Sequence, residues 1–248
     1  DIVKLSGKYI QAVPFPQKAV DLLQEAMVFL NQTKDKMLLG SHIASLVSQR
    51  TQIPVGDLES QEKEALLNLE DLIQKRIIDQ EEAVKEVSSA LRRARTEIGS
   101  RKGPMGTFLF LGPTGVGKTE TAKALAAIYF GSEERMVRLD MSEYQNVQDT
   151  ERLLGSATQK EIFCTQVREN PFSLILLDEL EKAHPNILNL FLQVLDEGHI
   201  TDGIGRKVSF QHTIIIATSN AGSQLILQAL KDQKDFAALK EDIIDYLF

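Results

Sequence analysis

A glycine-rich octapeptide, Gly112–Thr119, constrains this chain more than any other feature of its sequence. It reads Gly-Pro-Thr-Gly-Val-Gly-Lys-Thr and matches the pattern G-x-x-x-x-G-K-[ST]. A short apolar run precedes the octapeptide and a helical pattern follows it, so it should connect a buried strand to a helix. Glycines in such a connection let successive backbone N–H groups point at phosphate oxygens, and the start of the helix adds its positive end. The sequence therefore predicts a P-loop, which binds the phosphates of a nucleotide.

Two side chains of this segment have separate expected roles. Lys118 should reach the β- and γ-phosphates, and the Thr119 hydroxyl should take one position around Mg²⁺. The residues expected to contact the nucleotide here are Gly112, Pro113, Thr114, Gly115, Val116, Gly117, Lys118, Thr119 and Glu120. We therefore expect ATP or ADP, with Mg²⁺, as the ligands of this site.

The sequence around the octapeptide predicts an α/β domain. From residue 103 onward, short apolar runs alternate with helical patterns, and the runs are typical of strands buried on both faces of a parallel sheet. The expected strands are Phe108–Leu111, Met136–Leu139, Leu174–Leu177 and Thr213–Ala217. The expected helices are Thr119–Phe130 and Pro185–Glu197. This alternation predicts helices on both faces of the sheet.

Two acidic residues follow the third expected strand. Asp178 and Glu179 come directly after Leu174–Leu177, and ligands of open α/β sheets bind at the carboxyl ends of the strands. Asp178 should meet the Mg²⁺ held by Thr119, usually through a water because Mg²⁺ dehydrates reluctantly. Glu179 should polarise the attacking water as general base. The competing interpretation is two acids that cap a helix after a strand.

The fourth expected strand leads into Asn220. Its amide can hydrogen-bond the attacking water or an oxygen of the γ-phosphate. Asn220 is equally well interpreted as the N-cap of a following helix. The local sequence does not decide between these two roles.

Residues 1–100 have helical patterns in place of apolar runs. Pro14 and Pro16 precede an expected helix, a second short helix should follow, and a longer one should run from about 80 to 98. The apolar positions of the first helix are Ala19, Val20, Leu22, Leu23, Ala26, Met27 and Leu30. Those of the second are Ile43, Leu46 and Val47.

Composition excludes several classes of function. The chain has 28 Lys and Arg against 35 Asp and Glu, a net charge of −7, so it is a poor candidate for binding duplex nucleic acid. No apolar run approaches the ~20 residues that span a bilayer, and no signal peptide is visible. The single cysteine, Cys164, excludes an internal disulfide framework and fits a reducing compartment. We expect a cytoplasmic protein without nucleic-acid or membrane partners.

Taken together, the motifs resemble those of the Clp-type AAA+ unfoldases, which include the ATP-binding subunits of Clp proteases and the heat-shock disaggregases. The segments that resemble the second ATPase module are Gly112–Thr119, Arg138–Tyr144, Leu176–Pro185, Leu192–Gly198, Thr201–Asp202, Gly205–Arg206 and Thr218–Asn220. Those that resemble the lid of the first module and the join between modules are Leu5–Ile10, Pro16–Asp21 and Arg50–Pro54.

The resemblance implies a domain order. Residues 1–56 would be the small α-helical lid of a preceding ATPase module, and residues 57–100 a helical linker with the first helices of the second module. Residues 101–248 would be the AAA+ nucleotide-binding core, incomplete at its C-terminal end. The arginine finger, the fifth strand and the second lid of the family would lie beyond Phe248.

The resemblance also implies an activity. Family members assemble as hexameric rings, hydrolyse ATP between subunits and thread unfolded or aggregated protein substrates through the pore, some with a Clp peptidase or an adaptor. The family roles carry over to Lys118, Thr119, Asp178, Glu179 and Asn220. Two further residues, Ile77 and Ile78, match the pair that borders the adenine, although Asp79 stands where a glycine usually follows.

Two further departures from the family pattern, and the versatility of the fold, leave alternatives open. Ser156–Lys160 lacks the aromatic, glycine-rich pore loop that grips substrate, so a nucleotide-binding, weakly hydrolysing assembly scaffold is the second hypothesis. The lid lacks the coiled-coil insertion of disaggregases, while Gly222–Leu227 resembles that branch, so the sequence does not decide between the disaggregase and protease-subunit branches. A nucleic-acid motor on the same fold is a third hypothesis, which the acidic charge disfavours.

Overall fold

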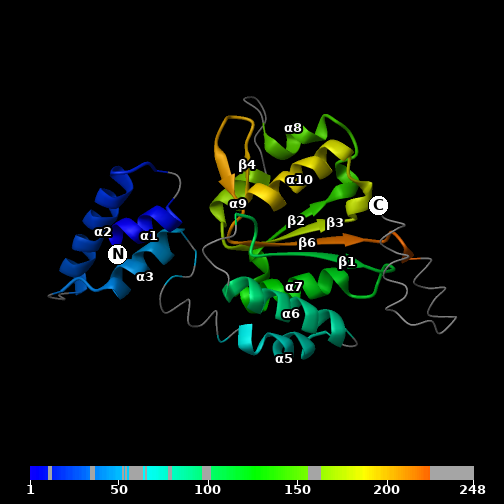
Figure 1. Cartoon of the computed structure of the whole chain (residues 1–248), viewed down its shortest axis with the longest axis horizontal. Helices are drawn as coiled ribbons and strands as arrows, with labels where there is room; N and C mark the ends of the chain where they lie inside the picture. Colours follow the sequence, from blue (N-terminus) through cyan, green and yellow to red (C-terminus); the bar gives the residue numbers. More distant parts are fainter. Residues whose placement is uncertain are drawn as a thin grey trace. The chain divides into compact units, whose positions relative to one another are not determined.

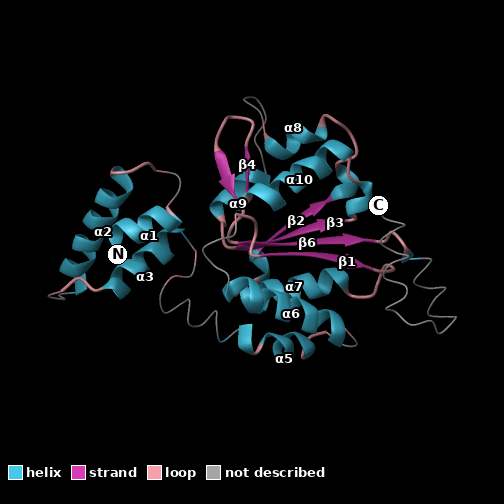
Figure 2. Ribbon diagram, viewed as in Figure 1, coloured by secondary structure: helices cyan, strands magenta, loops and turns pink. Residues whose placement is uncertain are grey.

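A computed structural model describes residues 1–10, 13–33, 37–51, 53, 55, 64, 66–77, 80–96, 102–155 and 163–223. The chain divides into two compact units, Asp1–Leu67 and Asn68–Phe248. Figure 1 and Figure 2 show the first as a group of helices and the second as a sheet covered by helices.

The first unit packs three helices against one another. They are α1 (Ile2–Tyr9), α2 (Gln17–Thr33) and α3 (Gly40–Thr51). Their shared core is small and consists of Ile10, Leu22, Ile43, Ala44, Val47 and Val55.

The apolar face predicted for α2 is only partly correct. Leu22 and Ala26 are fully buried, whereas Val20, Leu23 and Met27 are exposed by 48%, 43% and 54%. The sequence pattern is wider than the stripe that one helix can bury against two short neighbours, so part of it faces outward.

A buried lysine on α2 was not predicted. The Lys18 ammonium donates to the Ile10 carbonyl oxygen at 2.9 Å and lies 4.3 Å from the centre of the Phe15 ring. Buried charges need such partners, so Lys18 is held inside the first unit by its own neighbours.

The second unit is built on a four-stranded parallel sheet in the order β1-β6-β3-β2. The strands are β1 (Gly106–Leu111), β2 (Met136–Asp140), β3 (Ser173–Asp178) and β6 (Thr213–Ser219). All seven residues of β6 and the first five of β3 are buried, as the continuous apolar runs predicted. The predicted α/β fold class is thereby confirmed.

Helices cover both faces of this sheet (Figure 2). One face carries α5 (Leu69–Gln74), α6 (Glu81–Thr96) and α7 (Lys118–Tyr129). The other carries α8 (Asp149–Leu154), α9 (Phe163–Glu169) and α10 (Pro185–Glu197). Short 3₁₀ turns lie at η1 (Glu133–Arg135), η2 (Met141–Glu143) and η3 (Leu180–Lys182).

Helix α10 has the bounds that the sequence predicts, and its end shows why a glycine is needed there. Gly198 has a φ of +70°, and a Cβ at this position would lie 1.7 Å from the Lys102 carbonyl oxygen. A side chain could not be accommodated without moving the backbone, so Gly198 both ends the helix and permits this close approach.

A two-stranded antiparallel hairpin follows α10 and was not predicted. It consists of β4 (His199–Thr201) and β5 (Lys207–Ser209). The buried Asp202 carboxylate holds its turn by accepting from the backbone N–H groups of Ile204 and Arg206 and from the Arg206 and Arg168 side chains.

Candidate functional site

The parallel sheet order brings three strand ends to one edge of the second unit. Strand β6 lies between β1 and β3, and β1 runs directly into the glycine-rich octapeptide. The Gly112 N–H donates to the Ser219 carbonyl oxygen at 3.3 Å, so the octapeptide begins beside the end of β6. Residues that follow β1, β3 and β6 therefore meet at this edge, where ligands of open α/β sheets bind.

The octapeptide folds as the predicted strand-to-helix connection. Gly115 and Gly117 have φ values of +90° and +95°, in the left-handed region that favours glycine, and α7 begins at Lys118 immediately afterwards. The first N–H groups of a helix have no intrahelical acceptor, so the start of α7 presents donors and a positive dipole to an anion.

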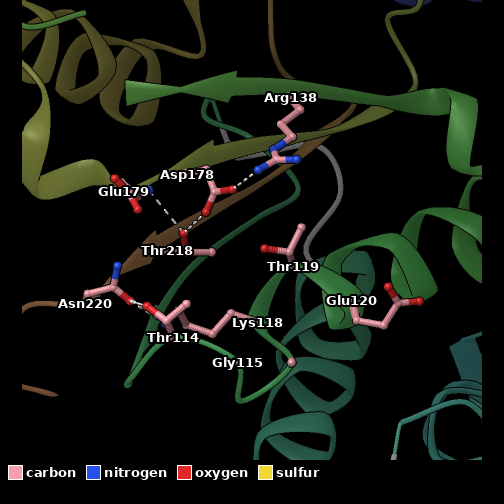
Figure 3. Close-up of a pocket in the computed structure, with 11 residues that line it drawn as sticks. Thr114, Gly115, Lys118, Thr119, Glu120, Arg138, Asp178, Glu179, Thr218 and Asn220 are labelled. Atoms are coloured by element: carbon pink, nitrogen blue, oxygen red, sulfur yellow. Dashed lines mark hydrogen bonds and ion pairs between the residues drawn. The ribbon is translucent and has the colours of Figure 1, made fainter. Parts of the chain in front are cut away.

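A cavity of about 430 Å³ opens at this edge. Most of its lining residues have polar side chains, and they come from the octapeptide, from the start of α7, from β2 and from the ends of β3 and β6. The lining residues are Thr114, Gly115, Gly117, Lys118, Thr119, Glu120, Arg138, Asp178, Glu179, Thr218 and Asn220. The structure therefore brings the predicted residues Lys118, Thr119, Asp178, Glu179 and Asn220 together around one cavity (Figure 3).

Lys118 and Asn220 are linked across the cavity. The Lys118 ammonium donates to Asn220 Oδ1 at 2.9 Å and to the carbonyl oxygens of Gly112 and Pro113 at 2.5 and 3.0 Å. Asn220 Oδ1 also accepts from the Thr114 hydroxyl at 3.4 Å. The Asn220 side chain thus faces the octapeptide Gly112–Thr119, called the phosphate loop below. The residues that follow 223 lie outside the described part of the chain.

Desolvation lowers the pKa of Lys118, and this effect outweighs the neighbouring carboxylates of Asp178, Glu181 and Glu179, which act in the opposite direction. The ammonium therefore lies in a partly water-excluded site, where its attraction for a phosphate is stronger than in bulk water.

Asp178 is held by a partner on each carboxylate oxygen. The Thr218 hydroxyl donates to Oδ1 at 2.5 Å, and Arg138 Nη2 donates to Oδ2 at 2.5 Å. The Asp178 side chain is only 14% exposed. These contacts hold the carboxylate in the lining of the cavity (Figure 3).

Glu179 has an unusual backbone conformation. Its φ is +55°, and among the described residues it is the only one other than glycine with a positive φ. Its N–H donates to the Thr218 hydroxyl at 3.3 Å, which helps to hold this turn in place. Such conformations cost about 1–2 kcal/mol in a residue with a Cβ and cluster at functional sites.

The donor set fits a magnesium ion. The Thr119 hydroxyl and the Asp178 carboxylate line the same cavity and present oxygen atoms, which are the ligands that Mg²⁺ prefers. The described residues contain no cluster of three or more His, Cys, Asp and Glu that could hold a metal by themselves.

Two residues between α5 and α6, Arg76 and Gln80, contact the phosphate loop and the start of α7. Arg76 Nη2 donates to Glu120 at 2.8 Å and to Glu133 at 2.5 Å, and Gln80 Nε2 donates to the Val116 carbonyl oxygen at 3.2 Å. Ile77 lies between Arg76 and Gln80 and is buried, but it does not line the described cavity. Ile78 lies outside the described residues.

Sequence reasoning missed four of these residues. Thr218 and Arg138 were noticed only as parts of longer motifs, and Arg76 and Gln80 were not singled out. The one local signal was for Thr218, a polar residue near the end of a strand and two positions before Asn220. The partners of Arg76 lie 44 and 57 positions away, so no local pattern indicates them.

Comparison with known proteins identifies the family. Residues 103–247 match the family described as AAA domain (Cdc48 subfamily). The chain belongs to this AAA domain family. The AAA domain match covers the sheet, the phosphate loop and the strand ends that carry Asp178, Glu179 and Asn220.

Relatives of this AAA domain chain include chaperones named ClpB. The chain is 47% identical over 217 residues to the chaperone protein ClpB of Meiothermus ruber, which covers 85% of this chain and 25% of the relative. It is 42% identical over 256 residues to ClpB of Vibrio cholerae, which covers 99% of this chain and 29% of the relative. The chain thus spans about a quarter of the length of these curated relatives.

Solved structures of Hsp104 also match. The closed state of Hsp104 with ATPγS and FITC casein has a TM-score of 0.88 and 31% identity, over 99% of this chain and 44% of that one. The S. cerevisiae Hsp104-ADP complex has a TM-score of 0.75. These matches confirm the predicted resemblance to Clp-type AAA+ proteins. Within the described helices, none combines the length and the apolar composition that a membrane crossing requires.

Proposed function

We propose that this AAA domain binds ATP with Mg²⁺ and hydrolyses it at the edge of the sheet where β1, β3 and β6 end. One observation carries the proposal: Lys118, Thr119, Asp178, Glu179 and Asn220 converge on one cavity although they come from three separate segments. A glycine-rich turn that merely joined a strand to a helix would not require carboxylates and an amide from two neighbouring strands around it.

Each side chain has a defined part in the proposed reaction. Lys118 binds the terminal phosphates as a cation, and its contact with Asn220 positions both groups toward the same ligand. Thr119 and Asp178 would hold Mg²⁺, which supplies charge neutralisation between the β- and γ-phosphates. The main contribution of these groups is to orient the nucleotide and stabilise negative charge.

Glu179 is the proposed general base. Its carboxylate lines the cavity next to Asp178, and its backbone is held in the left-handed region at the end of β3. A carboxylate there can accept the proton of a water that attacks the γ-phosphate, while the Asn220 amide orients that water or a phosphate oxygen.

We further propose that hydrolysis drives remodelling of unfolded or aggregated protein chains in a hexameric ring. The support is the identity with chaperones named ClpB and the match to Hsp104 over both compact units. These relatives favour the disaggregase branch over a protease subunit with a Clp peptidase partner. The weakly hydrolysing scaffold is less well supported, because the predicted base Glu179 and the other four predicted side chains all line the cavity.

The proposed function is tested with Lys118→Ala, and Lys182→Ala serves as the matched control because Lys182 is an exposed lysine on η3 outside the cavity. We expect Lys118→Ala to weaken ATP binding about 100-fold, since charge-assisted hydrogen bonds to phosphate are lost. Calorimetric titration measures binding, and ATP-dependent recovery of a heat-aggregated enzyme measures remodelling. Wild-type affinity for ATP in Lys118→Ala would contradict the proposal.

A further inference from the structure

Two side chains join the connection between α5 and α6 to the phosphate loop. Arg76 lies just after α5 and forms ion pairs with Glu120 in the first turn of α7 and with Glu133 in η1. Gln80 lies just before α6 and donates to the Val116 carbonyl oxygen within the loop. Both ends of the connection 76–80 are therefore fastened to the segment that binds phosphate.

These contacts lie on one particular side of the loop. Lys118, Asp178 and Asn220 mark the side on which the terminal phosphates would bind, while Glu120 lies on the opposite side of the cavity (Figure 3). Given the proposed function, on which this inference rests, the nucleoside must extend away from the carboxylates. It therefore extends toward the end of the cavity that Glu120 lines, and Glu120 is the residue that Arg76 holds.

The helices themselves do not depend on these contacts. Leu69 and Ile73 of α5 are fully buried, as are Val84, Val87 and Leu91 of α6 to within a few per cent. Apolar burial of this kind holds both helices in place, whereas exposed ion pairs contribute little to folding. What the polar contacts fix is the position of Arg76 and Gln80, and of the buried Ile77 beside Arg76, relative to the loop.

We propose that Arg76 and Gln80 form a clasp that positions the connection 76–80 against the phosphate loop and thereby sets the affinity for the nucleoside part of the nucleotide. They are positioning residues, because they act through the connection and contact no phosphate.

The chain offers a matched control on the same carboxylate. Lys123 lies 3.6 Å from Glu120 Oε2, but both residues belong to α7, so this pair joins nothing to the connection. Lys123→Gln removes a cation from Glu120 and leaves the clasp intact, whereas Arg76→Gln removes a cation and opens the clasp. Gln80→Ala opens it from the other end without changing any charge.

The experiment compares two ligands, ATP and inorganic tripolyphosphate, by calorimetric titration of the wild type and the three variants. We expect Arg76→Gln to weaken ATP binding about three- to tenfold, the range for two exposed ion pairs, and to leave tripolyphosphate binding within about twofold. Gln80→Ala should act in the same direction more weakly, and Lys123→Gln should bind both ligands like the wild type. Thermal unfolding of each variant establishes that it is folded.

The outcomes separate the clasp from the proposed function. If the wild type binds ATP and Arg76→Gln binds it equally well, the clasp is wrong and the nucleotide site stands. If Arg76→Gln weakens both ligands equally, Arg76 acts on the phosphate loop itself and the clasp is also wrong. If the wild type binds neither ligand, the proposed function fails and the clasp fails with it.

Discussion

The phosphate loop of this AAA domain is supported differently on its two sides. On the carboxylate side, defined by Asp178, Glu179, Thr218 and Asn220, every residue lies at or just beyond the end of a buried strand. On the clasp side, defined by Arg76 and Gln80, the contacts come from a connection between helices and are solvent-exposed.

The two kinds of support suit different roles: strand ends position groups for catalysis, and exposed side-chain contacts position groups for binding. The sheet fixes the position of side chains at its strand ends. Residues Ser173 to Leu177 of β3 pair one by one with Thr213 to Ala217 of β6. Chemistry requires such precision, because small errors in the placement of a catalytic group lower the rate strongly. The proposed clasp takes no part in the chemistry, so we expect exposed ion pairs to be sufficient for it.

The largest effect expected from removing a supporting contact is on the carboxylate side, from Thr218→Val. This change removes the hydroxyl that donates to Asp178 and accepts from the Glu179 N–H, while the shape of the side chain is kept. We expect about tenfold slower ATP turnover and a higher Mg²⁺ concentration for half-maximal rate, since a hydrogen bond to a charged group is lost.

Thr213→Val is the control for this prediction, because Thr213 lies at the other end of the same strand and its hydroxyl donates to the Phe210 carbonyl oxygen. It should lower thermal stability without altering the Mg²⁺ dependence. If both variants shift the Mg²⁺ dependence equally, Thr218 has no specific part in the site.

A smaller effect is expected from pH. Burial lowers the pKa of Lys118, so its positive charge is complete below that pKa and is lost as the pH rises through it, earlier than for an ordinary lysine. ATP affinity should therefore begin to fall at a pH below the ordinary lysine pKa of about 10.4. In contrast, the pKa of Arg76 is raised by its hydrogen bonds to Glu133 and Glu120, so the clasp keeps its charge throughout.

Lys118→Arg tests whether Lys118 causes the loss of ATP affinity at alkaline pH, because an arginine stays charged over the whole pH range of the experiment. Its ATP affinity should change little with pH, whereas the wild type and Arg76→Gln should lose affinity in parallel. An alkaline loss that persists in Lys118→Arg would assign the titration to another group.

The smallest effect is expected from Arg92→Gln. Arg92 of α6 pairs with Glu70 of α5, and both side chains are about one-third exposed. This pair joins the same two helices as the connection 76–80 but does not reach the phosphate loop. Removing it should change the free energy of unfolding by no more than about 1 kcal/mol and leave ATP affinity unchanged. A loss of ATP affinity equal to that of Arg76→Gln would show that helix packing, not the clasp, sets the affinity.

The sequence predicted the carboxylate side far better than the clasp side. The strands were predicted to within two residues at each end because each is a continuous apolar run, which is a local property. In a parallel sheet, the residues that follow the strands meet at one edge. The sequence alone therefore predicted that Asp178 and Asn220 lie near the phosphate loop.

Other features depend on contacts that no local pattern encodes. The hairpin β4–β5 has strands of only three residues, which are too short to show an alternation of apolar and polar side chains. Its turn depends on a hydrogen bond from Arg168 of α9 to Asp202. The exposure of Val20 and Met27 on α2 depends on how small the neighbouring helices are. Ser156–Lys160, where the family has its pore loop, and Ile78 lie outside the described residues, so those predictions stay predictions.

The central claim, that the carboxylate side performs the chemistry, is tested most directly with Glu179→Gln. A single-turnover experiment with saturating ATP and Mg²⁺ measures hydrolysis of the bound nucleotide, and a parallel titration measures its binding. We expect Glu179→Gln to bind ATP like the wild type but to hydrolyse it about 100-fold or more slowly, since a general base contributes this much. Hydrolysis at the wild-type rate by Glu179→Gln would show that Glu179 is not the general base.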